Sequence, residues 1–272
     1  MKSIESIFIL KNGNDFDFLE KSFVLPIYPT IFVKKRNMVA TQEATIVKNK
    51  PTIRRKPLMP HKLADRLELP AELRIPATFE DWIELSVDCD YRVEYRNGHV
   101  ISIFDSNSKT NETMGQATLT HEQLVLNIGT ALNNLFNDYQ DIIILGSNMP
   151  TFITHGKAVV NPDISIVKGT PNVIPYKFRK KTQNALTNPC VIVEVLSQGT
   201  RNYDLIEKKN DYFTIPSVKQ VIFIEQYWAQ VMSYTRQNDG KWLYVDYQEK
   251  EDTLSVLGEH LKLSDVYKKI NF

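Results

Sequence analysis

The sequence predicts an α/β or α+β domain in which helices flank a mixed β-sheet. The first observation is the order of the segments, which runs from helix to hairpin to helix, then through two acid-bearing strands and another helix to further strands. The second is a pair of short runs rich in β-branched residues, Ile164–Val167 and Cys190–Leu196, which are typical of buried strands. The third is an ordinary globular composition, with 42% hydrophobic and 24% charged residues, which indicates a substantial core.

Residues 1–75 are expected to form an extended or partly disordered leader before a folded domain at residues 76–272. Prolines at positions 51, 57, 60, 70 and 76 remove hydrogen-bond donors and interrupt regular structure. Within the leader, a short helix is expected at Lys62–Leu69. Met38 offers an alternative start of the protein, in which case the first 37 residues would not belong to it.

Two helices are predicted from capping boxes. The first begins at Thr78-Phe79-Glu80-Asp81 and should end near Ser86, and the second begins at Thr120-His121-Glu122-Gln123 and should end around Asn137. Apolar residues of the second helix recur on one face, which should pack against the core. His121 occupies the first turn, where a histidine is either a packed side chain or a ligand.

A hairpin is predicted between these helices. Asn97-Gly98 stands between two alternating runs and is a strong signal for a two-residue turn. The alternation places Glu94 inside a strand, on the face opposite to its apolar neighbours. Glu94 is therefore either a surface carboxylate paired with Arg92 or Arg96, or an acid of a functional site.

The rest of the chain is predicted to alternate between strands and short helices. Asp239-Gly240 marks a turn between two late strands, and Ser264 should cap a terminal helix at Asp265–Lys269. A helix is expected at Tyr203–Phe213, and further strands are expected at residues 142–145, 149–154, 158–160, 219–225, 230–235 and 241–247.

Residues 168–189 are predicted to form a loop of about twenty residues, a length that is usually functional or disordered. The loop contains a run of cations around an aromatic residue: Lys177, Arg179, Lys180 and Lys181. Such a run suits a phosphate backbone, and it is equally compatible with a mobile, solvated loop.

Two acids stand in or beside the apolar strands. Asp163 follows Pro162, which cannot donate a hydrogen bond to a neighbouring strand and so marks the start of a strand and not its middle. Glu194 lies inside the strand Cys190–Leu196. Burying an isolated carboxylate costs several kcal/mol, as an order of magnitude, unless a partner compensates the charge. If the two strands are neighbours, Asp163 and Glu194 can share a hard cation, for which Mg²⁺ fits best and Mn²⁺ is an alternative.

Composition excludes several classes of protein. The net charge of +1 gives no global basic field, and Cys89 and Cys190 have neither zinc-ligand nor disulfide spacing. No apolar run approaches the ~18 residues of a membrane span, no signal peptide is recognised, and no glycine loop suits a nucleotide. A cytoplasmic protein without a membrane partner is the simplest expectation.

From Thr78 to about Tyr247 the chain resembles the Uma-type restriction endonuclease-like proteins, which belong to the PD-(D/E)XK nuclease superfamily. The resemblance rests on the order and spacing of several short pieces. They are Thr78–Asp81, Tyr91–Glu94 with Asn97-Gly98, His121, Pro162–Ser165, Val193–Ser197, Thr200-Arg201, Asp204-Leu205, Lys208 and Tyr212.

The resemblance implies a restriction-endonuclease-like fold and metal-dependent cleavage of DNA. It implies that Asp163, Glu194 and the backbone carbonyl of Val195 bind the metal, that Glu94 is a further acid of the metal site, and that His121 lines the site. Leu196 stands where the superfamily motif has a lysine. The resemblance therefore implies that Lys208, from the following helix, takes the role of that lysine.

Three functions are compatible with the sequence. The first is a magnesium-dependent endonuclease that hydrolyses DNA phosphodiester bonds through an activated water. The second is a degenerate nuclease fold that binds nucleic acid through residues 177–181 without cleaving it. The third is a metal hydrolase for small phosphate esters, although the sequence lacks the extra histidines expected at a two-metal site. Since double-strand cutters often work in pairs, a homodimer is expected from mechanism alone.

Overall fold

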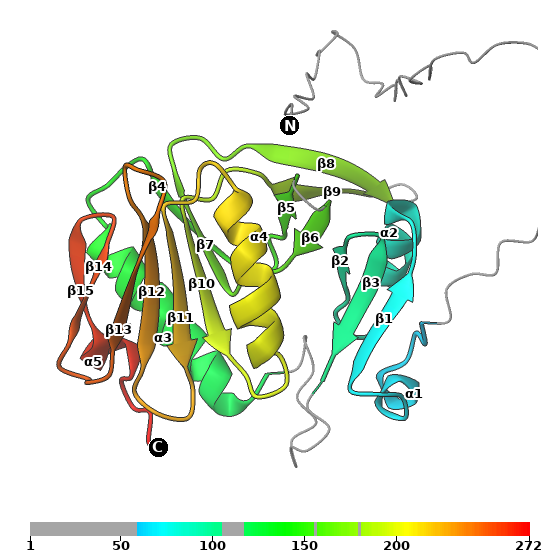
Figure 1. Cartoon of the computed structure of the whole chain (residues 1–272), viewed down its shortest axis with the longest axis horizontal. Coiled ribbons are helices and arrows are strands. Elements are labelled where there is room, and N and C mark those ends of the chain that lie inside the picture. The colour runs from blue at the N-terminus through cyan, green and yellow to red at the C-terminus, as the bar shows by residue number, and fades with distance from the viewer. Residues whose placement is uncertain (1–58, 105–116, 155–156, 179–180) are drawn as a thin grey trace, which may run out of the picture. The chain divides into compact units, whose positions relative to one another are not determined.

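The structure, a computed structural model, describes residues 59–104, 117–154, 157–178 and 181–272 (Figure 1). The described residues belong to one compact unit, residues 53–272. They form a seven-stranded sheet, a six-stranded sheet and a two-stranded hairpin, together with short helices. The predicted mixed α+β fold is confirmed. The proposed start at Met38 and most of the predicted leader lie outside the described residues.

The six-stranded sheet carries the two acid-bearing strands at its centre. Strand β10 (Val191–Leu196) pairs in parallel with β11 (Gln220–Glu225) and antiparallel with β7 (Ile164–Lys168). The sheet is completed by β12 (Val231–Arg236), β13 (Trp242–Tyr247) and β4 (Ile142–Gly146) in the order β13-β12-β11-β10-β7-β4. All six residues of β10 are buried, which explains its continuous apolar run.

One face of this sheet packs on α3 (Leu119–Leu135) through Leu124, Ile128 and Leu132. Thr118, and not the predicted Thr120, caps this helix, because the extended Thr118 accepts the backbone N–H of His121 with its hydroxyl. The helix therefore begins earlier than predicted, which places His121 at its third residue. The same core contains α5 (Leu263–Val266) and the β14–β15 hairpin (Thr253–Val256 and Glu259–Lys262).

The terminal helix also begins earlier than predicted. It starts at Leu263 after Lys262, so Ser264 lies inside it and does not cap it. Leu263 and Val266 are both buried, and this burial fixes the start of the helix more strongly than a serine hydroxyl would.

The opposite face of β10 packs on one continuous helical segment. It consists of a π-helical part, η1 (Tyr203–Lys208), followed by α4 (Lys209–Thr214). The N–H of Lys209 donates to the carbonyl of Asp204, which is the hydrogen bond to the fifth residue back that defines a π-helix. The predicted helix at Tyr203–Phe213 is confirmed, and its widened turn was not predicted.

The seven-stranded sheet has the order β1-β3-β2-β6-β5-β9-β8. The hairpin of β2 (Glu94–Arg96) and β3 (His99–Ile103) is confirmed, because Asn97 and Gly98 have φ values of 49° and 76°. Strands β6 (Ala158–Val160) and β5 (Thr151–Ile153) follow in the sheet. The helix α2 (Phe79–Asp88) starts with the predicted capping box of Thr78 and Asp81, and it covers an aromatic core.

The predicted loop at residues 168–189 is wrong. Residues Val173–Phe178 form β8 and Lys181–Leu186 form β9, and the two strands pair antiparallel along their whole length. The polar sequence of β9 conceals this strand, but Tyr176 and Ala185 are buried in the core beneath α2. Packing of these two side chains decides the conformation where the local sequence does not.

The predicted boundary at residue 75 falls inside β1 (Glu72–Pro76), which pairs with β3. The predicted short helix at Lys62–Leu69 is confirmed as α1 (Leu63–Leu67). Arg66 on this helix is fully buried, and its guanidinium donates to Ser102 of β3 and to the carbonyl of Pro70. A fully hydrogen-bonded buried guanidinium ties residues 59–76 to the folded domain.

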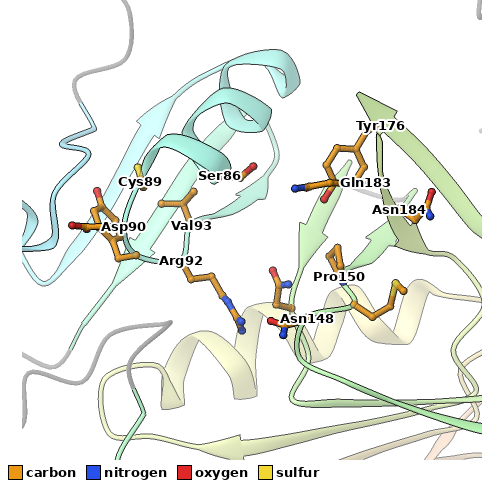
Figure 2. Close-up of a pocket in the computed structure, with 13 residues that line it drawn as sticks. Ser86, Cys89, Asp90, Arg92, Val93, Asn148, Pro150, Tyr176, Gln183 and Asn184 are labelled. Carbon is orange, nitrogen blue, oxygen red and sulfur yellow. The ribbon is translucent and has the colours of Figure 1, made fainter. Parts of the chain in front are cut away.

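A polar cavity of about 640 Å³ lies between the segment that leads into β2 and the strands β5 and β9 (Figure 2). Its walls come from residues 86–93, from the turn before β5 and from the β8–β9 hairpin. Among the helices of the described ranges, none is long and apolar enough to span a bilayer.

Candidate active site

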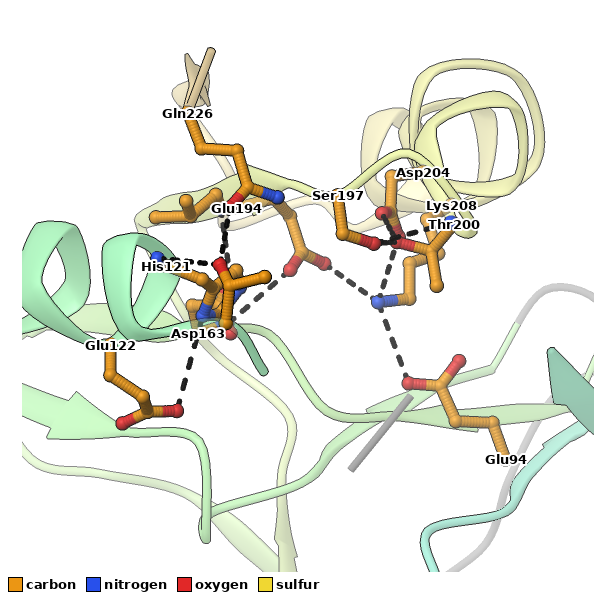
Figure 3. Close-up of polar contacts among 12 residues, drawn as sticks. Glu94, His121, Glu122, Asp163, Glu194, Ser197, Thr200, Asp204, Lys208 and Gln226 are labelled. Atoms are coloured by element: carbon orange, nitrogen blue, oxygen red, sulfur yellow. Dashed lines mark hydrogen bonds and ion pairs between the residues drawn. The ribbon is translucent and has the colours of Figure 1, made fainter. Parts of the chain in front are cut away.

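Asp163 and Glu194 lie side by side at one end of the paired strands β7 and β10 (Figure 3). The ladder ends at the pair Ile164 and Val193, so the next residue on each strand is one of the two acids. The N–H of Asp163 donates to Oε2 of Glu194 at 3.3 Å, and the N–H of Val195 donates to Oδ2 of Asp163 at 2.7 Å. The structure therefore brings together the two acids that the sequence singled out.

Glu194 projects from the face of β10 that packs on the helical segment η1–α4. Its Oε1 atom accepts from the Lys208 ammonium at 3.0 Å and from the Tyr212 hydroxyl at 2.5 Å. Two donors on Oε1 fix the rotamer of this carboxylate and leave Oε2 facing Asp163.

Lys208 is the centre of a buried ion cluster. Besides Glu194, its Nζ lies 3.1 Å from Oδ1 of Asp204 and 3.5 Å from Oε1 of Glu94. Burial alone would lower the pKa of Lys208, but the charges of Asp204, Glu194 and Glu94 hold that pKa well above its usual range. Lys208 thus carries a positive charge near neutral pH.

Glu94 reaches this cluster from the other sheet. Oε1 accepts from the backbone N–H of Asn161 at 2.9 Å, and Oε2 accepts from the Tyr203 hydroxyl at 3.0 Å. Both oxygens of Glu94 therefore have protein donors. Burial raises the pKa of Glu94, and the charge of Lys208 opposes that effect.

His121 approaches Asp163 from the first turn of α3. Its Nε2 lies 3.4 Å from Oδ2 of Asp163. Burial, the largest single effect, would lower the pKa of His121, but the hydrogen bond with Asp163 and the nearby negative charges, that of Asp163 first, together raise the pKa. For Asp163, burial would raise the pKa, and the hydrogen bond and charge of His121 hold it below its usual range. Asp163 is thus the acid of the cluster that stays ionised most readily.

The cluster holds more acids than cations. Burial raises the pKa of Glu194 to about 8 and also raises the pKa of Asp204, with Lys208 opposing the shift in both cases. Four carboxylates, those of Glu94, Asp163, Glu194 and Asp204, share Lys208 and His121. Ionising all four would leave an uncompensated negative charge in a low-dielectric environment, which is unfavourable without another cation.

The donors around Asp163 and Glu194 are suited to a hard cation. Within the described ranges, no cluster of three or more His, Cys, Asp or Glu side chains forms a metal site. A mixed set of donors could hold an ion instead: the carboxylates of Glu194 and Asp163 and the carbonyl of Val195. In an extended strand the N–H and C=O of one residue point the same way, so the Val195 carbonyl faces the side on which its N–H meets Asp163. Oxygen donors of this kind fit magnesium or manganese.

Several residues of the site were missed by the sequence reasoning. Tyr203, on η1, and Asn161, directly after β6, hold Glu94, and their roles depend on contacts between segments far apart in the sequence. Gln226 follows β11, is 2% exposed and accepts the Thr118 hydroxyl at 2.6 Å, while its Nε2 has no hydrogen-bond partner within the described structure. The one available signal for Gln226 was its place beside Glu225 at the end of the apolar run Val221–Ile224.

Two of the predicted basic residues lie on the strands β8 and β9. Lys177 is exposed on β8, Lys181 begins β9, and Arg179 and Lys180 lie outside the described residues. In Figure 1 the end of β8 lies next to α2 and away from the carboxyl end of β10. The predicted contact of the basic residues with nucleic acid stays a prediction.

The chain matches one family model and is similar to two proteins of Synechocystis. The model of the Uma2 family, described as "Putative restriction endonuclease", matches residues 76–264. In Synechocystis sp. (strain ATCC 27184 / PCC 6803 / Kazusa), the uncharacterized protein sll1609 is 28% identical over 154 residues, which cover 57% of this chain and 78% of that protein. The uncharacterized protein slr1290 of the same strain is 26% identical over 160 residues, which cover 58% and 80% of the two chains.

A solved structure shares the fold. The crystal structure of a putative nuclease belonging to DUF820 from Anabaena variabilis ATCC 29413 aligns with a TM-score of 0.53 at 17% identity. The alignment covers 71% of this chain and 98% of the other. The restriction-endonuclease-like fold expected from the sequence is therefore confirmed.

Proposed function

We propose, from the premise that this chain belongs to the Uma2 family of restriction endonuclease-like proteins, that it is a divalent-metal-dependent endonuclease that hydrolyses DNA phosphodiester bonds. The observation that carries the proposal is the arrangement of Asp163, Glu194 and Lys208. The two acids stand opposite each other at the end of adjacent strands, the backbone N–H of Asp163 donates to the Glu194 carboxylate, and a buried ammonium lies 3.0 Å from that carboxylate.

The residues that would hold the metal are Asp163, Glu194 and the carbonyl of Val195. When bound, a magnesium or manganese ion supplies Lewis-acid polarisation of the phosphate and acidifies a coordinated water. Asp163 is kept anionic by His121. Tyr212 and Lys208 fix Glu194.

Lys208 supplies the positive charge that the reaction needs near the phosphate. Negative charge builds on the phosphate oxygens in the transition state, and a preorganised cation stabilises it. Asp204 and Glu94 hold the ammonium in place. Since both oxygens of Glu94 already accept protein hydrogen bonds, its geometry favours positioning Lys208 over direct coordination of the metal.

The alternative of binding without cleavage rested on Leu196, which stands at the position of the superfamily lysine. The geometry supports cleavage more strongly, because Lys208 places its ammonium on Glu194 from the neighbouring helix. Hydrolysis of small phosphate esters has no separate observation in its favour.

The test is the nicking of supercoiled plasmid by the purified chain with Mg²⁺, with Mn²⁺ and with EDTA. Cleavage that requires metal is expected for the wild type and is expected to be lost in Asp163→Ala. The control is Asp239→Asn, which changes an exposed acid in the β12–β13 turn. An intact plasmid under every condition, or an Asp163→Ala variant that cuts like the wild type, contradicts the proposal. Sedimentation on DNA tests the expected homodimer.

A further inference from the structure

The polar cavity of Figure 2 borders the candidate active site. Asn161 lines the cavity, and its backbone N–H donates to Glu94 at 2.9 Å. Val93, also in the lining, directly precedes Glu94. Asn161 stands two residues before Asp163, and two residues span at most about 7 Å of extended chain. A ligand in the cavity would therefore lie next to a phosphate bound at Asp163 and Glu194.

Four polar side chains of the cavity are unused by the fold. Arg92, Asn148, Gln183 and Asn184 line the cavity, and none of them makes a side-chain hydrogen bond or ion pair in the part of the chain that the structure describes. Figure 2 shows the guanidinium of Arg92 extended toward Asn148. Each amide presents two donors and an acceptor, so these side chains could recognise a ligand without breaking an existing contact.

A fixed aromatic wall completes the cavity. Tyr176 is 9% exposed, and its ring lies 5.5 Å from that of Trp82 and 6.3 Å from that of Phe79. Packing against two aromatic neighbours holds the ring in one orientation. A wall that is already ordered costs little additional entropy on binding.

The chemistry of the lining fits a nucleobase. A cavity of about 640 Å³ falls in the range of about 300–1,000 Å³ found for small-molecule sites. Asn and Gln side chains pair with base edges, adenine above all, and aromatic rings support unstacked bases. Arg92 is balanced in the lining by Asp90, so the cavity suits a neutral heterocycle with one phosphate better than a polyanion.

We propose that this cavity binds one unstacked nucleobase of the substrate strand beside the scissile phosphodiester, with Arg92 on an adjoining phosphate. The proposal rests on the proposed nuclease function and adds a site for a base to it. It assigns Asn148, Gln183 and Asn184 to base recognition.

The test compares two short strands by fluorescence anisotropy in EDTA, where no cleavage occurs. One is a hexamer of deoxyadenosine, and the other has the same sugar-phosphate chain without bases. The wild type is expected to bind the intact hexamer about tenfold more tightly than the base-free one, because stacking and edge contacts are lost together. The double variant Asn148→Ala/Asn184→Ala is expected to bind both strands within about twofold of each other.

Two further variants, one a control and one a second test, keep the comparison specific. Gln237→Ala removes an exposed amide from the β12–β13 turn and should keep the wild-type ratio. Asn184→Asp keeps the shape of the side chain but removes its donors, and it should lose most of the preference for the intact strand. Asn148 and Asn184 are exposed, so the double variant and Asn184→Asp should both have the melting temperature of the wild type.

An unchanged ratio in the double variant overturns the proposal, as does equal binding of both strands by the wild type. Plasmid cleavage by the same preparations separates this failure from that of the nuclease function. If the wild type cleaves the plasmid but shows no base preference, the nuclease function stands and the base-binding role of the cavity is wrong. If the wild type does not cleave but shows a base preference that the double variant loses, the base-binding role of the cavity stands and the nuclease function is wrong.

Discussion

The helical segment η1–α4 carries two ion clusters that differ in their charge balance. The Lys208 cluster, defined above by four acids with Lys208 and His121, lies on the side that faces β10. The Arg96 cluster consists of Arg74, Arg96, Glu207 and Asp211, and it joins the same helix to strands β1 and β2.

The two clusters differ in charge balance and in burial. In the Arg96 cluster two guanidiniums meet two carboxylates of the helix, with several hydrogen bonds between them. Such a partly exposed, balanced network stabilises docking modestly. In the Lys208 cluster the acids outnumber the cations, and three of the four acids, Glu94, Glu194 and Asp204, are almost completely buried. A surplus of buried charge is unfavourable for folding and is characteristic of sites that bind a further ion.

The largest expected effect comes from removing a metal-facing acid. Glu194→Gln keeps the shape of the side chain but removes a charge, so cleavage should fall by about 10²–10³-fold or more. Because burial raises the pKa of Glu194 to about 8, this side chain is mostly neutral at pH 7 without metal, so the free energy of unfolding without metal should not decrease. Plasmid nicking and urea denaturation measure the two quantities. The matched change in the balanced cluster, Glu207→Gln, should leave cleavage within about threefold, and an equal loss there would remove the distinction between the clusters.

Removal of the shared cation should affect both activity and folding. Lys208→Met leaves Glu94, Glu194 and Asp204 without their ion partner, and breaking a buried pair costs about 3–5 kcal/mol. Arg96→Met, in contrast, removes one of two guanidiniums from a half-buried network and should cost about 1 kcal/mol. Urea denaturation at neutral pH compares them. A Lys208→Met variant as stable as Arg96→Met would show that the acids of the Lys208 cluster are neutral without the lysine.

Added metal should stabilise the protein through the Lys208 cluster and not through the Arg96 cluster. An ion that binds the folded chain contributes about 2.7 kcal/mol at a concentration one hundred times its Kd. Mg²⁺ or Mn²⁺ should therefore raise the melting temperature of the wild type and not that of Asp163→Ala. Glu207→Gln should respond like the wild type. If the metal still raises the melting temperature of Asp163→Ala, the metal binds elsewhere.

The sequence revealed the acids more reliably than their neighbours. Asp163 and Glu194 stand out because charges are rare in apolar strands, and Lys208 and Asp204 lie four residues apart on one helix. The contact of Glu94 with Lys208 could not be predicted from periodicity, since it joins a strand of one sheet to the helical segment that packs on the other sheet. Periodicity shows which face of its strand or helix a residue occupies, but it does not show which other element packs against that face.

Two missed hairpins show a second limit. The β14–β15 turn uses Leu257 and Gly258 at φ values of 51° and 96°, and leucine rarely takes a positive φ, so the turn has no sequence signal. Strand β9 reads as polar, and only Ala185 and Leu186 at its end are buried. In both cases tertiary packing compensates a weak local preference.

Gln226 offers the smallest and most specific prediction. Its Nε2 is buried without a partner in the described structure, and an unsatisfied donor of this kind costs about 1–3 kcal/mol. Thr118, which accepts the N–H of His121 and donates to Oε1 of Gln226, fixes the amide at the edge of the site. If the amide donates to the substrate, Gln226→Met should reduce cleavage by about tenfold while leaving the free energy of unfolding unchanged or higher. A structural role predicts the reverse, a less stable variant with unchanged cleavage, so urea denaturation and single-turnover nicking of the same variant distinguish the two.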